Sequence, residues 1–130
     1  MERRALQIAI LLAGLVPLLG GGLGVTFGEA AFGPWAGGGE DSHIRYLSGL
    51  LLAIGLMFWS CIPTIERRGE TMRLLTAMVF VGGLARLGGL IVVGDPGRMR
   101  WALVMELVAT PAICLWQARV SRLGAAAGSE

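Results

Sequence analysis

Two stretches decide the fold of this chain: residues 72–93, MRLLTAMVFVGGLARLGGLIVV, and residues 101–118, WALVMELVATPAICLWQA. Each is an apolar run close to the ~20 residues that an α-helix needs to cross the hydrocarbon core of a bilayer. Each also carries one charge in its interior, Arg86 in the first run and Glu106 in the second. Because a lone charge in hydrocarbon is unfavourable, such residues tend to pair and to mark functional positions.

Two further apolar runs, residues 5–27 and 44–63, precede these stretches. Hydrophobic residues make up 55% of the 130 residues, and the mean hydropathy is +0.69. Such a composition is atypical of soluble domains. The sequence therefore predicts an all-α integral membrane four-helix bundle, with one four-span domain over residues 1–123. The small, polar residues 124–130 predict a disordered tail.

The arginines predict the orientation of these spans. With both termini in the cytoplasm, seven arginines lie inside and three outside, which satisfies the positive-inside rule. The inner set is Arg3, Arg4, Arg67, Arg68, Arg73, Arg119 and Arg122, and the outer set is Arg45, Arg98 and Arg100. The absence of lysine and the abundance of glycine and alanine indicate a GC-rich bacterial genome, and hence the bacterial inner membrane.

Arg86 and Glu106 are predicted to meet. Arg86 lies eight residues before Gly94, and Glu106 lies seven residues after Met99. At ~1.5 Å per residue, both side chains sit roughly 10–12 Å below the turn that joins the third and fourth helices. A short turn makes the two helices antiparallel neighbours, so opposite charges at matching depth can form an ion pair.

The residues around both charges predict that they point into the bundle. Residues three and four positions away share a helix face, and small residues on such a face are typical of close helix contacts in membranes. For Arg86 these neighbours are Gly82, Gly83, Gly89 and Leu90, and for Glu106 they are Ala102, Leu103, Ala109 and Thr110.

Pro111 adds a polar group to this region. A proline inside a helix frees the carbonyl four residues back, which is that of Leu107 here. Either Thr110 or Arg86 is expected to satisfy that carbonyl.

The second helix offers a third participant, Arg45, whose face also carries small residues. If that face turns inward, Arg45 lies above the Arg86–Glu106 pair. The predicted polar cluster, which binds a ligand or pairs within the membrane, is Asp41, His43, Arg45, Tyr46, Arg86 and Glu106.

Purely structural interpretations of these features also stay open. The Arg86–Glu106 pair can serve only to fix helix packing, since breaking a buried pair costs about 3–5 kcal/mol. His43 is equally compatible with an ordinary position at the membrane interface. The Gly-x-x-x-Gly spacings Gly20/Gly24 and Gly24/Gly28 suit packing within one chain or a homo-oligomer through glycine-rich helix faces.

Several function classes find no support in the sequence. It has no His-Glu-x-x-His, Cys-x-x-Cys or Gly-x-Ser-x-Gly motif, so no catalytic residue and no cofactor is predicted. One histidine and two remote cysteines give too few ligands for a metal site. A net charge of +2 with scattered arginines argues against nucleic acid as a partner.

Three motifs occur in order along the chain: DSHIRYLSG (41–49), VGGLARL (81–87), and EL (106–107) followed by Pro111. Together they resemble a family of small four-helix bacterial membrane proteins, domain of unknown function 4345, over most of the chain. Tyr46 departs from the phenylalanine usual in that family. The resemblance implies no activity. It implies that the family's characteristic polar positions are Asp41, His43, Arg45, Arg86 and Glu106.

Three functional hypotheses follow. The first is a non-enzymatic integral membrane protein, in contact with membrane lipid, that binds a partner or a small amphipathic or anionic ligand in an outward-facing polar pocket among helices two to four. The second is a small oligomeric proton-coupled transporter that uses Glu106, whose pair with Arg86 then has to break during transport. The third is an accessory subunit of a membrane enzyme.

Overall fold

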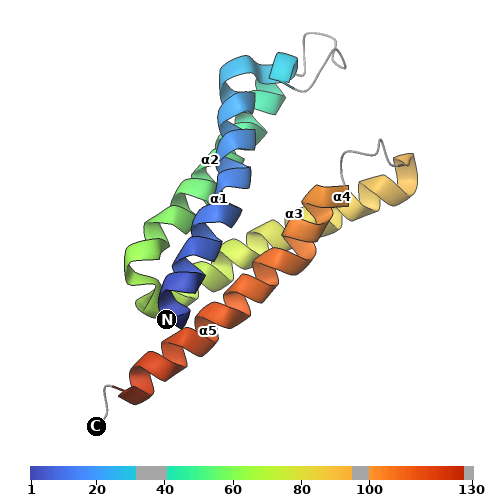
Figure 1. The fold of residues 1–130 in the computed structure, drawn as a ribbon. Helices are drawn as coiled ribbons and strands as arrows, with labels where there is room; N and C mark the ends of the chain where they lie inside the picture. The colour runs from blue at the N-terminus through green and yellow to red at the C-terminus, as the bar shows by residue number, and fades with distance from the viewer. Residues whose placement is uncertain (32–40, 95–99, 128–130) are drawn as a thin grey trace. The chain divides into compact units, whose positions relative to one another are not determined.

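The computed structural model describes residues 1–31, 41–94 and 100–127, and nearly all of them are helical, with no strand among them (Figure 1). The helices are α1 (Glu2–Phe27), the 3₁₀ turn η1 (Gly28–Ala31), α2 (Asp41–Cys61), the 3₁₀ turn η2 (Ile62–Arg67), α3 (Gly69–Val93), α4 (Arg100–Val104), the π-helical segment η3 (Met105–Ala109) and α5 (Thr110–Ala127). Because α4, η3 and α5 follow one another without a break, the chain has four long helices in its described part.

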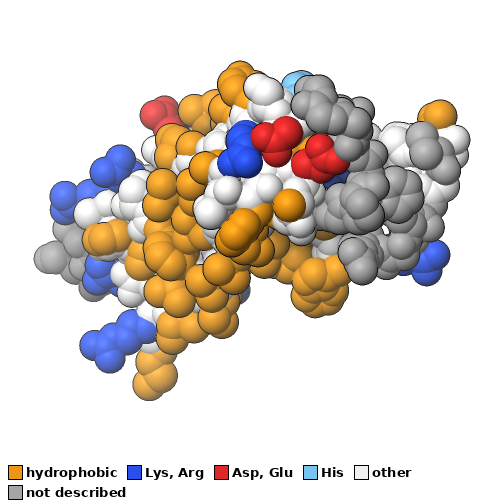
Figure 2. All heavy atoms as spheres, turned by 90° about the horizontal axis from the view of Figure 1, so that it is seen from above, with side chains coloured by type: hydrophobic (Ala, Val, Ile, Leu, Met, Phe, Trp, Pro, Cys, Tyr) orange, Lys and Arg blue, Asp and Glu red, His pale blue; other side chains and the backbone are white. Residues whose placement is uncertain are grey.

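All four helices are long and apolar enough to cross a membrane, judged by length and composition. The all-helical prediction is thus confirmed, and each helix extends beyond the apolar run that predicted it. Figure 2 shows hydrophobic side chains over much of the visible surface. In the most apolar 18-residue windows of α3 and of the α4–α5 helix, only 11% and 6% of the residues are buried. Exposed apolar surface on this scale is typical of lipid or protein contacts.

The end of the chain differs from its prediction. α5 continues through residues 124–127, where the sequence predicts a disordered tail. The reason is the helix propensity of three consecutive alanines, which outweighs the cost of one glycine. Residues 128–130 lie outside the described residues, as do Arg98 and most of the turn predicted to join the third and fourth helices.

Contacts within the chain divide it into two compact units. Unit 1 comprises Met1–Ala13 and Cys61–Glu130, and unit 2 comprises Gly14–Ser60. The prediction of a single four-span domain over residues 1–123 stays a prediction. The two units are described separately below.

In unit 2, glycines bring α1 and α2 into close contact. A Cβ built on Gly21 would lie 2.5 Å from the backbone nitrogen of Leu52, and one built on Gly55 would lie 2.9 Å from Cγ of Leu18. Neither position has room for a larger residue without moving a helix. These two glycines therefore serve packing between α1 and α2.

The best-packed part of unit 1 surrounds η2. Seven hydrophobic residues are buried there, and Ile65 of η2 is fully enclosed among them. The set is Leu6, Ile10, Cys61, Ile65, Met72, Leu75 and Val120. They come from α1, the end of α2, η2, α3 and α5, so the core holds the first turns of α1 against the start of α3 and the end of α5. Neither Cys61 nor Cys114 forms a disulfide in the described part of the chain.

Three side chains donate hydrogen bonds to backbone carbonyls of η2. Gln117 of α5, almost fully buried, donates to the Ile65 carbonyl at 2.7 Å, and Gln7 of α1 donates to the Ile62 carbonyl at 2.8 Å. Ser121 donates to the Glu66 carbonyl at 2.7 Å. Carbonyls at a 3₁₀ turn between two helices have few helical partners, and that of Ile65 accepts a long bond of 3.4 Å from the Arg68 N–H. The two glutamines add shorter bonds to the carbonyls of η2.

Candidate functional site

Arg86 of α3 and Glu106 of η3 form a two-bond ion pair. Nε of Arg86 donates to Oε2 of Glu106 at 3.0 Å, and Nη2 donates to Oε1 at 2.9 Å. This parallel arrangement is the strong form of an arginine–carboxylate contact, because two charge-assisted bonds fix both distance and orientation. The side chains are 36% and 18% exposed, respectively. The contact predicted from matching depth is therefore present; its role in binding stays a prediction.

Gly83 allows the two helices to come close enough for this pair. A Cβ built there would lie 2.9 Å from Cβ of Glu106 and 2.8 Å from Cδ2 of Leu107. Both distances are shorter than real Cβ contacts, so a side chain at position 83 would push the η3 segment away. Gly83 sits one turn before Arg86, and the absence of a side chain lets the guanidinium reach across to Glu106.

Gly82 and Gly89 are also predicted to mark a close helix contact, but they make none within the described part of unit 1, where nothing lies within 4 Å of a Cβ built on either residue. Gly82 and Gly83 are about 100° apart around the helix axis, so only one of them can face η3. The Arg86 side chain lies between these two directions, which explains why it is only part-buried.

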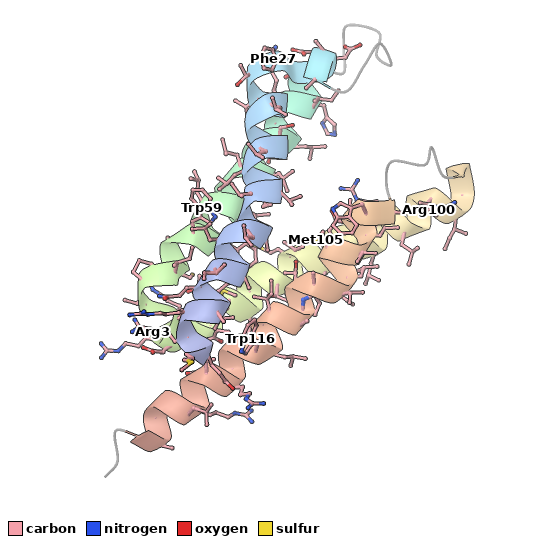
Figure 3. All side chains as sticks on the ribbon, in the orientation of Figure 1. Arg3, Phe27, Trp59, Arg100, Met105 and Trp116 are labelled. Carbon is pink, nitrogen blue, oxygen red and sulfur yellow. The ribbon has the colours of Figure 1, made fainter. Side chains whose placement is uncertain are left out.

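Glu106 is presented by a π-helical segment, Met105–Ala109, whose first residue is labelled in Figure 3. The Thr110 N–H donates to the carbonyl of Met105, five residues back, and the Thr110 hydroxyl donates to the same oxygen at 2.8 Å. Pro111 follows, and its nitrogen has no hydrogen to donate to the preceding turn. A wider helical turn just before the proline accommodates this missing hydrogen bond. Such turns are frequent at functional sites.

This arrangement corrects the expectation for Thr110. The sequence predicts that Thr110 or Arg86 satisfies the carbonyl of Leu107, but the Thr110 hydroxyl bonds Met105 instead. The reason is the change from α to π hydrogen bonding, which brings the carbonyl of the residue five positions back over Thr110. The sequence signal that was available, a Thr-Pro dipeptide within an apolar helix, indicates a disturbed turn but not its type.

Arg45 and Asp41 form a separate arrangement in unit 2. Nε of Arg45 donates to Oδ2 of Asp41 at 2.7 Å. Its Nη1 donates to the carbonyls of Val25 at 2.6 Å and Thr26 at 3.1 Å, in the last turn of α1. Oδ1 of Asp41 accepts the Glu29 N–H at 2.9 Å. These bonds tie the end of α1 to the beginning of α2, so Arg45 acts as a cap for the carbonyls of α1.

Gly28 completes this helix junction. Its φ of +56° is in the left-handed region that glycine adopts readily. A Cβ built there would collide with the Asp41 carboxylate and lie 2.9 Å from Nη2 of Arg45. Tyr46, at 64% exposed, and the exposed His43 lie on the same helix turn as this junction. The structure therefore groups the six predicted residues as two local pairs with two exposed neighbours. A single cluster of all six stays a prediction.

The residues that sequence reasoning missed are Gln7 and Gln117, which hold η2. Both are uncharged polar residues inside apolar runs. That position is itself a signal, because a buried amide needs hydrogen-bond partners. The sequence gives no indication that the partners are carbonyls of the connection between α2 and α3.

The fold and the pair define a class: a small protein, all-helical in its described part, with four helices of membrane-spanning length and an arginine–glutamate pair, Arg86–Glu106, between two apolar helices. Within that class, the model of the family described as Domain of unknown function (DUF4345) matches residues 5–117. The chain belongs to this family, as the three sequence motifs indicate. No curated protein and no solved structure matches the chain.

Proposed function

We propose that this chain is a non-enzymatic protein of the bacterial inner membrane that binds a small amphipathic ligand through the Arg86–Glu106 pair. The observation that carries the proposal is the pair itself: two short bonds between part-buried charges on neighbouring apolar helices. A salt bridge in such a place requires desolvation of both ions, and apolar residues of similar size often stabilise a fold as well or better. A ligand is one physical reason for charges at this position.

The chemistry of the pair indicates the ligand's head group. A guanidinium can hold a carboxylate or a phosphate oxygen. Because Glu106 already balances the charge of Arg86, a zwitterionic head group fits as well as an anionic one. Val79 and Leu90, which lie two turns before and one turn after Arg86 on the same face of α3, are half-buried and offer a surface for a hydrocarbon tail. An amphipathic molecule would use both parts of this surface.

A double substitution distinguishes binding from packing. Arg86→Leu and Glu106→Leu each leave one charge without its partner and should destabilise the fold by about 3–5 kcal/mol. The double variant should be much better tolerated, because neither charge remains. The measurement is the free energy of unfolding of all four proteins in the same detergent.

The ligand is then sought by thermal unfolding of wild type and double variant with fatty carboxylates, anionic phospholipids and zwitterionic phospholipids. Stabilisation of the wild type beyond that of the double variant would support a binding role for the pair. If no compound raises the unfolding midpoint of a folded wild type, or if the double variant responds equally, the pair is packing only.

The π segment favours one second candidate, a proton-coupled carrier with Glu106 as the titrating group. A π turn can convert to α and move Glu106 away from Arg86, which a carrier would require. Glu106→Gln should then abolish proton-coupled flux in liposomes while leaving the helical content unchanged. Undiminished flux through the Gln variant would exclude this mechanism.

A further inference from the structure

Most of the arginines gather at the end of unit 1 that contains η2. The contacts of this end join the start of α1, η2 and α5: Nε of Arg3 lies 3.0 Å from Oε1 of Glu66, and Nη2 of Arg119 lies 3.1 Å from Oε1 of Glu2. Seven of the eleven arginines belong to these segments and to the first turns of α3. The set is Arg3, Arg4, Arg67, Arg68, Arg73, Arg119 and Arg122.

Positive charge at this end exceeds the negative charge beside it. The described acidic residues there are Glu2, Glu66 and Glu70, so seven arginines against three carboxylates leave an excess of four positive charges. Glu2 and Glu66 are already paired. Among the described residues, four of the arginines have no carboxylate, carbonyl or hydroxyl partner. They are Arg4, Arg67, Arg73 and Arg122.

Two of the arginines line a hollow at the start of α1. It measures about 460 Å³ and is lined by Met1, Arg3, Arg4 and Gln7. Arg3 is held there by Glu66 and by the Pro63 carbonyl, which accepts a bond of 3.2 Å from Nη2. Arg3, which is labelled in Figure 3, is therefore held in place by η2. Arg4 adds a cation without a partner among the described residues.

The next turns of α1 are apolar and exposed. Ile8 is 58% exposed, Leu11 44% and Leu12 57%. A basic hollow followed along the same helix by an apolar surface matches a molecule with an anionic head and hydrocarbon chains. A free phosphate ion would make no use of the apolar part. Charge complementarity and this adjoining surface together point to lipid.

We infer that the η2 end of unit 1 binds the phosphate of an anionic phospholipid, with the head group in the hollow beside Arg4 and the acyl chains along α1. The other arginines without partners hold further anionic head groups around the same end. This lipid site does not involve Arg86 or Glu106, so it stands or fails independently of the ligand proposed for that pair.

Retention of lipid by the full-length protein tests this inference. The protein is transferred into micelles doped with phosphatidylglycerol or phosphatidylcholine, and bound lipid is counted by native mass spectrometry. We expect retention of phosphatidylglycerol over phosphatidylcholine, and a loss of roughly fivefold in that retention for Arg4→Gln, the effect of one basic residue at an anionic surface. Arg4→Lys should keep most of the binding because it keeps the charge.

Arg100→Gln is the matched control. It removes the same charge from the far end of the α3–α5 hairpin, where Figure 3 labels Arg100, and should leave retention unchanged. Equal retention of the two lipids, an unaltered Arg4→Gln variant, or an equal loss in Arg100→Gln would overturn the inference. Thermal unfolding with inorganic phosphate in lipid-free micelles is the last arm. Stabilisation as large as that given by phosphatidylglycerol would assign the hollow to free phosphate instead.

Discussion

At the scale of single residues, the Arg86–Glu106 pair depends on the absence of a Cβ atom at Gly83. Gly83 lies against Cβ of Glu106 and the side chain of Leu107, whereas Gly82 faces open space within the same unit. The two residues are adjacent in sequence and identical in chemistry. Their difference arises only from the direction in which each faces, so substitutions at the two positions should have opposite consequences.

Gly83→Ala should destabilise unit 1 by about 1–3 kcal/mol, the usual cost of overpacking. It should also weaken the Arg86–Glu106 pair, because the helices must separate to make room for the methyl group. The measurement is the free energy of unfolding in detergent. Gly82→Ala is the control and should lie within about 1 kcal/mol of the wild type, on the stabilising side if helix propensity decides. Equal destabilisation by both changes would contradict the described approach of α3 and η3.

At the scale of elements, the π turn decides where Glu106 points. It is a local departure from α geometry, Met105–Ala109, next to a residue that cannot donate, Pro111. The hydroxyl of Thr110 adds a second donor to the Met105 carbonyl. An element of this kind is stabilised by few hydrogen bonds, so a change in one side chain can shift the equilibrium between its π-helical and α-helical conformations.

Thr110→Val keeps the shape of the side chain but removes the donor. We expect a loss of about 0.5–1.5 kcal/mol, the net contribution of one hydrogen bond, together with reduced coupling between Arg86 and Glu106 in a double-mutant cycle. Thr110→Ser retains the hydroxyl and should behave nearly as the wild type. A Val variant with unchanged coupling would mean that the π turn does not position Glu106.

The sequence predicts the helices well because apolar runs report directly on length and burial. It also predicts the Arg86–Glu106 contact, since depth in a hairpin follows from residue counting. It does not predict the partners of Arg45, because the Val25 and Thr26 carbonyls belong to backbone, which every residue has. The π turn is missed for a related reason: its hydrogen bonding is chosen by packing, and a Thr-Pro dipeptide suits several geometries.

At the scale of the whole molecule, the distribution of arginines predicts the orientation in the membrane. Seven arginines gather at one end of unit 1, and the residues predicted to lie outside carry three. We expect both termini in the cytoplasm, because short loops rich in arginine resist translocation. Reporter enzymes fused after residue 127 and within 32–40 measure this directly. The first should be active only as a cytoplasmic reporter and the second only as a periplasmic one. The reverse pattern would contradict the predicted topology.

The side-chain hydrogen bonds to η2 also bear on the order in which the chain folds during synthesis. The carbonyl of Ile65 accepts a bond from the Arg68 N–H at 3.4 Å and a shorter one, at 2.7 Å, from Gln117, a residue 52 positions later. During synthesis the first three helices therefore exist for a time with this carbonyl held only by the longer bond. The last helix adds the shorter one. A nascent chain that stalls before that point has a less firmly held connector between α2 and α3, and a protease that recognises such incomplete intermediates would have a simple physical criterion for removing them.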